Sequence, residues 1–515
     1  MTEVTSAIVH TTAGRVEGNH RRGLYVFCGI PYAAPPVGTR RWLPPQPPEP
    51  WSGTRLAKRF ASTAPQNPPE ARVLAAPQPE PQDEDCLYLN VFTPALDDAR
   101  RPVLFWIHGG GFTSGSGSAL VYYGRNLATR GNTVVVTVNY RLGTLGFLNL
   151  KELTGGRIPA IGNEGLLDQA FALEWVRDNI SGFGGDPDNV TIFGESAGGM
   201  SVGAQLAMPG SRGLFHRAVP QSGAAHTASS MERAVKVLQA FLDITGVDAA
   251  DTDGLRSLSL DRLLDAQKEL AARAARPDSD LGGMPLQPVI DGNVLPDLPV
   301  RAIARGSADG VPVMVGSTLE EWKLFAAMDQ DIARLDDERL LRRCRRMLPS
   351  ADVPALIETC RAARQKRGEP ATPADIFMAI QTDRTFRMPA IWLAETLMQR
   401  ETPAYHYIFT WKSPAMNGAL GACHALDIGF LFGSYEESFS GTGPEADALS
   451  YNIQDAWTAF ARTGDPSCES LGRWPPYGER RETMLLGREC VLVEAPYEEE
   501  RRAWEAISAA RAGTF

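Results

Sequence analysis

Several features that mark common classes of protein are absent from this 515-residue sequence. The first ten residues lack a cationic start followed by an apolar stretch, so we expect no secretory signal peptide. No run of 18 apolar residues occurs, so we expect no membrane span. The net charge of −10 argues against a nucleic-acid partner, and we expect no basic cluster to offset it. The composition is typical of a soluble, acidic globular protein.

Cysteine is scarce and its pattern excludes further classes. The seven cysteines are scattered, and no Cys-x-x-Cys or Cys/His spacing indicates a metal site. We therefore expect reduced, mostly buried thiols in a cytoplasmic protein. The phosphate-binding pattern G-x-x-x-x-G-K-[ST] is also missing, as is a G-x-G-x-x-G pattern after a strand. No cofactor is expected.

Alternation of apolar and amphipathic segments indicates the fold class. Apolar residues recur with helical spacing between residues 163 and 180. Continuous apolar runs, typical of strands covered on both faces, occur at residues 103–107, 133–138, 190–193, 218–221, 311–315 and 405–411. This alternation predicts an α/β fold with a large, mostly parallel sheet and helices on both faces.

The remaining segments predict the domain organisation. Residues 24–60 are rich in Pro and Trp and are expected to form irregular chain on the surface. Residues 61–85 contain six prolines and no aromatic residue, which predicts a loop. We expect residues 1–515 to form one domain with a helical, cap-like region at roughly 320–400.

The most informative motif is Gly-Glu-Ser-Ala-Gly at residues 194–198, a G-x-S-x-G pattern. It follows an apolar run and precedes a helical segment of small residues. A sharp strand-to-helix turn holds a serine hydroxyl exposed beside a base, because flanking glycines let strand and helix pack closely. The pattern also occurs by chance, but this context favours Ser196 as a nucleophile.

A serine nucleophile needs a base, and in this architecture the histidine follows both the serine and the acid along the chain. His216 and His226 come too soon after Ser196 to leave room for an acid loop. His406 lies within an aromatic strand pattern and is interpreted as a packed strand residue. His424 occupies a loop after the last strong strand, so it is the predicted base.

The acid and the oxyanion donors are expected in loops that follow strands. The strand at 311–315 is followed by two candidate acids, Glu320 and Glu321, and adjacent side chains seldom point the same way. A Gly-Gly-Gly run comes shortly after Ile107. Its backbone N–H groups, with that of Ala197, predict an oxyanion hole, although a flexible turn is the alternative use of such a run.

These motifs resemble the type-B carboxylesterases of the α/β-hydrolase superfamily. That group contains bacterial esterases of the para-nitrobenzyl esterase type, liver carboxylesterases, cholinesterases and the non-catalytic neuroligins. The resemblance covers nearly the whole chain. Matching segments include Phe-Cys-Gly-Ile-Pro-Tyr at 27–32, Glu-Asp-Cys-Leu at 84–87, Gly-Asn-Glu-Gly at 162–165 and the run from Phe183 to Gly199. It implies an α/β-hydrolase fold with helical excursions over the active site.

The resemblance also implies roles for individual residues. The implied site consists of a triad of Ser196, Glu321 and His424, an oxyanion hole formed by the N–H groups of Gly110, Gly111 and Ala197, and a supporting hydroxyl at Ser222. Glu321 is selected over Glu320 because the second carboxylate of the family's acid motif is the catalytic one. A structural ion pair between Arg141 and Asp168 is implied as well.

Three departures from the family pattern bear on substrate and location. Trp322 stands where a glycine usually follows the acid, so we expect it to narrow or line the pocket. No cysteine at 57–85 is available to pair with Cys86, as in secreted relatives, which supports a free thiol and a cytoplasmic location. Residues 61–85 lack the aromatic residue of a choline site, so cholinesterase activity is not expected.

The sequence therefore predicts a cofactor-independent serine esterase that cleaves a small carboxylic ester through an acyl-enzyme. Action on carbamates, amides or lactones is the alternative, because the acyl-enzyme chemistry is shared. A neuroligin-like binding module is disfavoured, since serine, acid and histidine are all present. Phe112, Trp322 and Phe325 are candidate pocket residues for an apolar group. A monomer or weak homodimer is expected.

Overall fold

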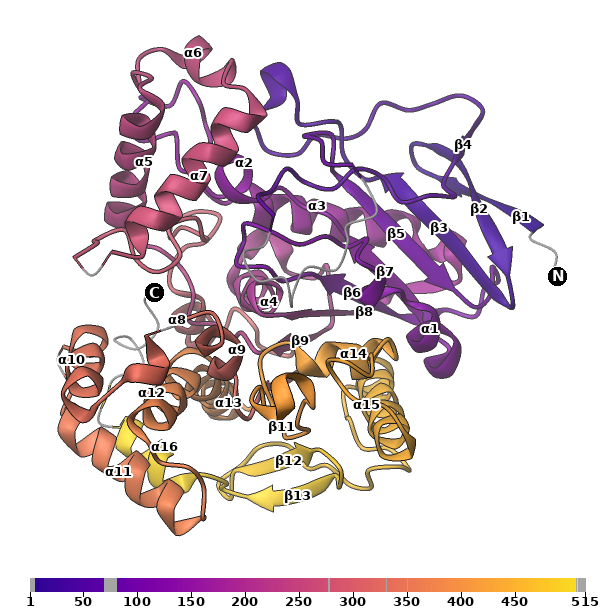
Figure 1. Ribbon diagram of the computed structural model, residues 1–515. Coiled ribbons are helices and arrows are strands. Elements are labelled where there is room, and N and C mark those ends of the chain that lie inside the picture. Colours follow the sequence, from indigo (N-terminus) through magenta and orange to yellow (C-terminus); the bar gives the residue numbers. More distant parts are fainter. Residues whose placement is uncertain are drawn as a thin grey trace.

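The computed structural model describes residues 5–68, 81–276, 278–329, 331–349, 351–505 and 507. A 13-stranded sheet runs through the centre of the molecule (Figure 1). Its spatial order is β1-β2-β3-β5-β7-β6-β8-β9-β10-β11-β12-β13, and β4 pairs with β2. The strands are β1 (Thr5–Thr11), β2 (Gly14–Arg21), β3 (Leu24–Pro31), β4 (Thr54–Leu56), β5 (Tyr88–Thr93), β6 (Arg101–Ile107), β7 (Val134–Val138), β8 (Gly185–Glu195), β9 (Arg217–Gln221), β10 (Val313–Thr318), β11 (Ala404–Phe409), β12 (Glu482–Leu486) and β13 (Val491–Glu494).

The centre of the sheet is parallel and its two ends are antiparallel. From β7 through β12 every neighbouring pair is parallel, whereas β1, β2, β3 and β5 on one side and β13 on the other pair antiparallel. All residues of β6 and β7 are buried. The apolar runs of the sequence therefore correspond to strands covered on both faces, as predicted.

Alternate residues of each central strand enter two separate cores. In β6, Val103 and Phe105 belong to one apolar cluster, and Leu104 and Trp106 belong to the other. Because successive side chains of a strand point to opposite faces, the two clusters lie on the two faces of the sheet. Helices α3 and α4 contribute to the first cluster, and α1, α14 and α15 contribute to the second.

Helices fill the layers on either side of the sheet and the regions beyond its edge (Figure 1). In the described part of the chain, none of them is long and apolar enough to cross a membrane. The α-helices are α1 (Arg125–Gly131), α2 (Gly143–Gly146), α3 (Glu164–Asn179), α4 (Ala197–Ala207), α5 (Met231–Thr245), α6 (Thr252–Arg256), α7 (Leu260–Ala274), α8 (Pro299–Ala304), α9 (Trp322–Ala326), α10 (Asp337–Met347), α11 (Val353–Lys366), α12 (Pro373–Thr382), α13 (Met388–Gln399), α14 (Leu426–Phe432), α15 (Pro444–Thr463) and α16 (Glu498–Glu505).

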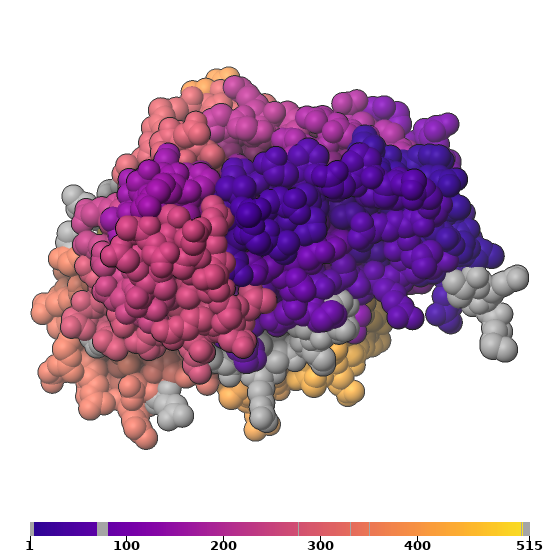
Figure 2. Space-filling view, turned by 90° about the horizontal axis from the view of Figure 1, so that it is seen from above, coloured from indigo at the N-terminus to yellow at the C-terminus, as the bar shows by residue number. Residues whose placement is uncertain are grey.

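Two groups of helices lie between consecutive strands along the chain. Helices α5 and α7 pack together beside the N-terminal segment, seen in magenta next to indigo in Figure 2. Arg41 fixes this contact by donating to the carbonyls of Arg256 and Leu258. Helices α9 to α13 lie between β10 and β11 in the sequence, and α13 packs on both of these strands. A π-helix, η6 (Asp383–Arg387), joins α12 to α13.

The N-terminal region differs from the sequence-based expectation. Residues 24–60 contain β3 and β4, so the prediction of irregular chain is wrong there. The pairing of β3 with β5 is irregular between Phe27 and Ile30, where Gly29 adopts a φ of 71°. A glycine and a proline inside a short strand hide its alternation in the sequence. In the predicted loop at 61–85, residues 69–80 lie outside the described residues.

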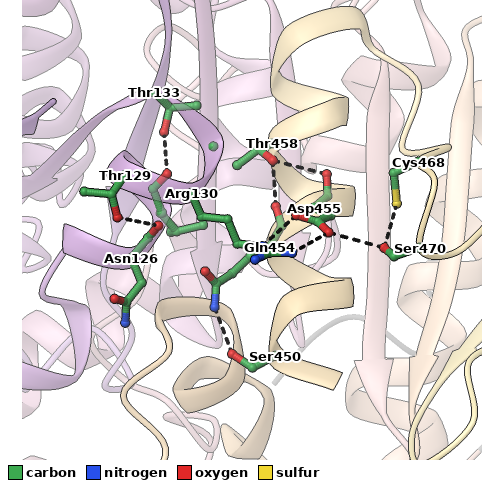
Figure 3. A network of polar contacts seen from close by, with 12 residues as sticks. Asn126, Thr129, Arg130, Thr133, Ser450, Gln454, Asp455, Thr458, Cys468 and Ser470 are labelled. Carbon is green, nitrogen blue, oxygen red and sulfur yellow. Dashed lines mark hydrogen bonds and ion pairs between the residues drawn. The ribbon is translucent and has the colours of Figure 1, made fainter. Parts of the chain in front are cut away.

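Polar contacts join α1 to α15, which are distant in sequence (Figure 3). Arg130 donates to both carboxylate oxygens of Asp455, at 2.7 and 2.8 Å. The hydroxyl of Ser470 lies 3.4 Å from the same carboxylate, and the guanidinium of Arg130 covers the ring of Tyr451. A partly exposed pair of this kind contributes about 0.2–1 kcal/mol, so it orients the two helices more than it stabilises them.

Candidate active site

Ser196 lies at the sharp turn between β8 and α4. Its φ of 58° and ψ of −125° form a conformation that residues other than glycine rarely adopt. A Cβ at Gly194 would come within 2.6 Å of the Ile107 carbonyl oxygen, and one at Gly198 within 2.0 Å of the same atom. Glycine is therefore required at both flanks, and the close packing forces the serine to project from the turn.

His424 is held by Glu321 on the loop that follows β10. Its Nδ1 atom lies 2.6 Å from Oε2 of Glu321, and the Thr318 N–H donates to Oε1 at 2.7 Å. Both partners of this pair are buried. Glu320 instead forms an ion pair with Lys323 at 2.7 Å. The structure thus brings Glu321, and not Glu320, to the histidine.

The second ring nitrogen of His424 faces another carboxylate. Its Nε2 atom lies 3.2 Å from Oε1 of Glu195, the residue before Ser196, and the Glu195 side chain is buried. Within the described chain, no hydrogen bond joins the Ser196 hydroxyl to His424. Catalytic hydrogen bonds are often long or misaligned without a substrate, so this arrangement is compatible with Ser196 as a nucleophile.

A third carboxylate, Asp427 at the start of α14, completes the surroundings of the histidine. Gln221 donates to its Oδ2 atom at 3.0 Å, and Trp457 donates to Gln221 at 3.2 Å. Oδ1 of Asp427 and Oε1 of Glu195 are buried and have no hydrogen-bond partner among the described residues. A buried carboxylate oxygen without a hydrogen-bond donor favours the protonated, neutral form of the acid.

The pKa values of His424, Glu195 and Asp427 are all raised by their surroundings. Burial opposes the imidazolium form of His424, but the Glu195 and Glu321 carboxylates outweigh it and raise its pKa to about 9. Burial raises the pKa of Glu195 to about 8 and that of Asp427 to about 6. Because His424 and Glu195 are in contact, they titrate as a coupled pair.

The glycine loop after β6 presents backbone donors. Gly110 and Gly111 have φ values of 110° and 61°, and their N–H groups have no acceptor among the described residues. A Cβ at Gly110 would come within 2.2 Å of the Ser114 carbonyl oxygen, so no other residue fits there. Tyr140 fixes the loop by donating to the carbonyl of His108 at 2.7 Å. The N–H of Ala197, the first of α4, has no acceptor within the helix.

Aromatic side chains cover one side of the histidine. Phe325 and Phe386 lie 5.0 and 4.8 Å from the His424 ring, measured between centroids. Trp322 packs on Phe325 at 4.8 Å and contacts this group only indirectly. Phe112 has no exposed surface, and its ring packs on that of Phe147 at 4.9 Å. Phe386 lies on η6, and its approach depends on tertiary packing that no sequence motif marks.

The structure also describes the Arg141–Asp168 pair and Ser222, which were expected to support the site. The predicted ion pair of Arg141 and Asp168 is confirmed: the guanidinium lies 2.7 Å from the carboxylate, and both are buried. The Ser222 hydroxyl is buried, but it makes no hydrogen bond to any described residue. Among the described residues, no group of three or more His, Cys, Asp or Glu side chains is placed to hold a metal ion.

Comparisons of sequence and structure show which known proteins the chain is similar to. The sequence profile of the carboxylesterase family matches residues 5–504. The chain is 39% identical to the para-nitrobenzyl esterase of Bacillus subtilis, over 97% of this chain and 98% of that protein. It is 34% identical to the phenmedipham hydrolase of Pseudarthrobacter oxydans, over 92% and 93% of the two chains. A solved carboxylesterase from Geobacillus stearothermophilus superposes with a TM-score of 0.85 at 37% identity, covering 96% of this chain and 99% of that one.

Proposed function

The chain belongs to the carboxylesterase family and is a carboxylic ester hydrolase, and from that premise we propose that Ser196, His424 and Glu321 form its catalytic triad. The observation that supports these roles is the buried contact between His424 and Glu321, combined with the projecting turn at Ser196. The presence of the serine, the acid and the histidine together, and relatives named as an esterase and a hydrolase, support catalysis rather than a binding role alone.

In the proposed reaction, the Ser196 hydroxyl attacks the ester carbonyl carbon while His424 Nε2 takes its proton. The N–H groups of Gly110, Gly111 and Ala197 donate to the oxyanion of the tetrahedral intermediate. His424 then gives its proton to the leaving alcohol, and an acyl-enzyme remains on Ser196. Water gives a proton to the same nitrogen as its oxygen attacks the acyl carbon. The bond from that carbon to the Ser196 oxygen then breaks, His424 returns the proton to this oxygen, and the carboxylic acid is released. Glu321 holds the imidazole by its Nδ1–H and stabilises its charged form.

The triad is tested by paired substitutions. We expect Ser196→Ala to reduce p-nitrophenyl acetate turnover by roughly 10⁴-fold or more, with unchanged thermal unfolding. Glu321→Gln should also cripple turnover. Glu320→Gln is the matched control, because it removes the ion pair with Lys323 while the amide oxygen can still accept from the Ala422 N–H. Retained burst kinetics in Ser196→Ala, or a loss confined to Glu320→Gln, would refute the assignment.

Substrate range follows from pocket shape rather than from the triad. Relatives at similar identity carry different substrate names, para-nitrobenzyl esterase and phenmedipham hydrolase among them. We propose an apolar acyl or alkyl group beside Phe325 and Trp322, with carbamates, amides and lactones as alternative substrates. A panel of p-nitrophenyl esters of increasing chain length, with a carbamate and an amide added, would rank these classes by kcat/KM. We further propose a cytoplasmic monomer or weak dimer, supported by seven cysteines without a disulfide.

A further inference from the structure

A basic pocket lies at the N-terminal end of the sheet, and its lining does not include the proposed triad. It has a volume of about 390 Å³. Its cationic side chains are Arg21, Arg22, Lys58, Arg59 and Arg125, and no carboxylate lines it. We refer to it as the basic pocket. The whole chain carries a net charge of −10, so this local excess of positive charge opposes the overall balance.

Three chain segments that are distant in sequence build the basic pocket. The first is the turn from β2 to β3, where Arg22 adopts a φ of 53°. The second follows β4, and the bridge between Cys28 and Lys58 places it beside β3. The third enters α1 through Tyr123, whose ring packs edge-on against Phe92. In Figure 1, β2, β3 and α1 lie at the same end of the molecule. No run of basic residues in the sequence reveals this site.

Most of these cations lack a counter-charge. Lys58 pairs with Glu17 at 2.5 Å, and the Arg125 side chain hydrogen-bonds to Tyr123. In the described ranges, the guanidinium groups of Arg21, Arg22 and Arg59 form neither an ion pair nor a hydrogen bond. Like charges gathered in a concave, partly apolar site repel each other, and a bound anion would relieve that repulsion.

A second charged cavity provides the contrast. A cavity of about 190 Å³ behind the acid loop is lined by five cations and five carboxylates. Four of its five cations form ion pairs within the protein; Arg387, for example, pairs with Asp383 at 2.6 Å and Arg367 with Glu369 at 3.0 Å. The positive and negative side chains of this cavity balance in number, so its charge gives no reason to expect a bound ion. The basic pocket has no such compensation.

We propose that the basic pocket binds a small polyanion of the phosphate type that carries a flat apolar ring. Guanidinium groups present planar, forked donors that match phosphate oxygens in pairs. The rings of Phe60 and Tyr123 line the same cavity and offer a surface for the apolar part. The acidic charge of the remaining protein disfavours a long polyanion, so the occupant is a small molecule.

Calorimetric titration of the full-length protein at low salt tests the proposal with three probes: inorganic phosphate, pyrophosphate and phenyl phosphate. We expect pyrophosphate and phenyl phosphate to bind more tightly than phosphate, and added salt to weaken all three. The double variant Arg22→Gln/Arg59→Gln should weaken pyrophosphate binding at least about tenfold, because each charge-assisted bond to the anion is lost.

The matched control is Arg345→Gln/Arg346→Gln on α10, two exposed arginines with the same change in net charge. It should leave pyrophosphate binding unchanged, and both double variants should retain p-nitrophenyl acetate turnover, which reports an intact fold. Absence of binding by every probe, or an equal loss in the control, would overturn the proposal. If a single-stranded DNA oligonucleotide binds more tightly than pyrophosphate and displaces it, the proposal of a small ligand is wrong and the pocket binds a nucleic acid. Ser196→Ala should still bind pyrophosphate. The proposal for the basic pocket and the proposed triad can therefore be refuted independently of each other.

Discussion

Glu195 precedes Ser196 in the sequence and contacts His424 in the structure. Its carboxylate therefore affects the pKa of the proposed base. Its carboxylate lies 3.2 Å from Nε2 and helps to raise the pKa of His424 to about 9. The catalytic form requires a neutral imidazole, and activity is therefore lost as the pH falls through this raised pKa. Removal of the carboxylate lowers the pKa and preserves the neutral form at lower pH.

We therefore predict that Glu195→Gln moves the acid limb of the kcat/KM profile to lower pH by about one unit or more. Turnover of p-nitrophenyl acetate between pH 5 and 9.5 measures the shift. Glu320→Gln is the control, because Glu320 contacts Lys323 and not His424. If the acid limb of Glu195→Gln stays in place or moves to higher pH, Glu195 does not raise the pKa of His424.

Single residues with a motif could be predicted from the sequence, and those without one could not. The proposed triad follows from chain order and from the resemblance. Glu195 occupies the position of the G-x-S-x-G pattern that any residue can fill, so its carboxylate carries no signal in one sequence. Asp427 and Phe386 reach His424 only through the packing of α14 and η6. The effect of Asp427 and Phe386 on His424 depends on their distance from the ring and on their burial, which the sequence does not give.

Among the elements, η6 links the active-site side of the helical region to the C-terminal helix. Asp383 of η6 pairs with Arg387 at 2.6 Å and accepts from the Trp504 indole of α16 at 3.1 Å. The neighbouring Phe386 packs on His424. A π-helix is often found where a side chain must be redirected within a helix, and here its residues face two different partners.

We predict that Asp383→Asn destabilises the protein by on the order of 3 kcal/mol, because Arg387 is left buried with an incomplete partner. Urea unfolding measures the loss, and amide hydrogen exchange of residues 498–505 should become faster as α16 docks less firmly. Asp336→Asn at the N-terminal cap of α10 is the control, since Asn caps a helix as well as Asp. Equal stability of Asp383→Asn and wild type would contradict a structural role for the pair.

Elements that follow a regular pattern were predictable, and irregular ones were not. The parallel strands β6 to β11 appear in the sequence as apolar runs, because both of their faces are buried. Strand β3 was missed, since a glycine, a proline and a pairing irregularity interrupt its alternation. The π-helix has no sequence pattern of its own and emerges only when α12 and α13 pack around it.

Across the whole molecule, net charge and local charge differ. The first 60 residues contain eight Lys and Arg and three Asp and Glu, against an overall charge of −10. The composition gives the sign of the electrostatic potential averaged over the whole protein, which indicates whether it attracts polyanions such as nucleic acids in general. It does not predict the basic pocket, because residues 21–22, 58–59 and 125 meet only after folding. The expectation that no basic cluster exists is therefore wrong: four arginines occur at 342–346 in the sequence, and the basic pocket forms on folding.

The pH dependence of global stability also reflects buried groups that the sequence does not mark. His226 is buried, neither of its ring nitrogens has a hydrogen-bond partner among the described residues, and burial lowers its pKa to about 3. An unfolded histidine takes up a proton below pH 6.5, whereas this folded one stays neutral. Protons therefore bind preferentially to the unfolded state, and stability is lost as the pH falls from about 6.5 toward 3.

We predict that His226→Phe removes this acid sensitivity. The gain in unfolding free energy over wild type should be larger at pH 5 than at pH 8 by about 2 kcal/mol, the cost of keeping one histidine neutral at pH 5. Packing changes from the larger ring against Trp392 are the same at both pH values and cancel in this comparison. Urea unfolding at the two pH values measures the difference, with His20→Phe on the partly exposed β2 as control. A gain that is equal at pH 5 and pH 8 would mean that His226 is protonated in the folded protein, and that its site is open to water.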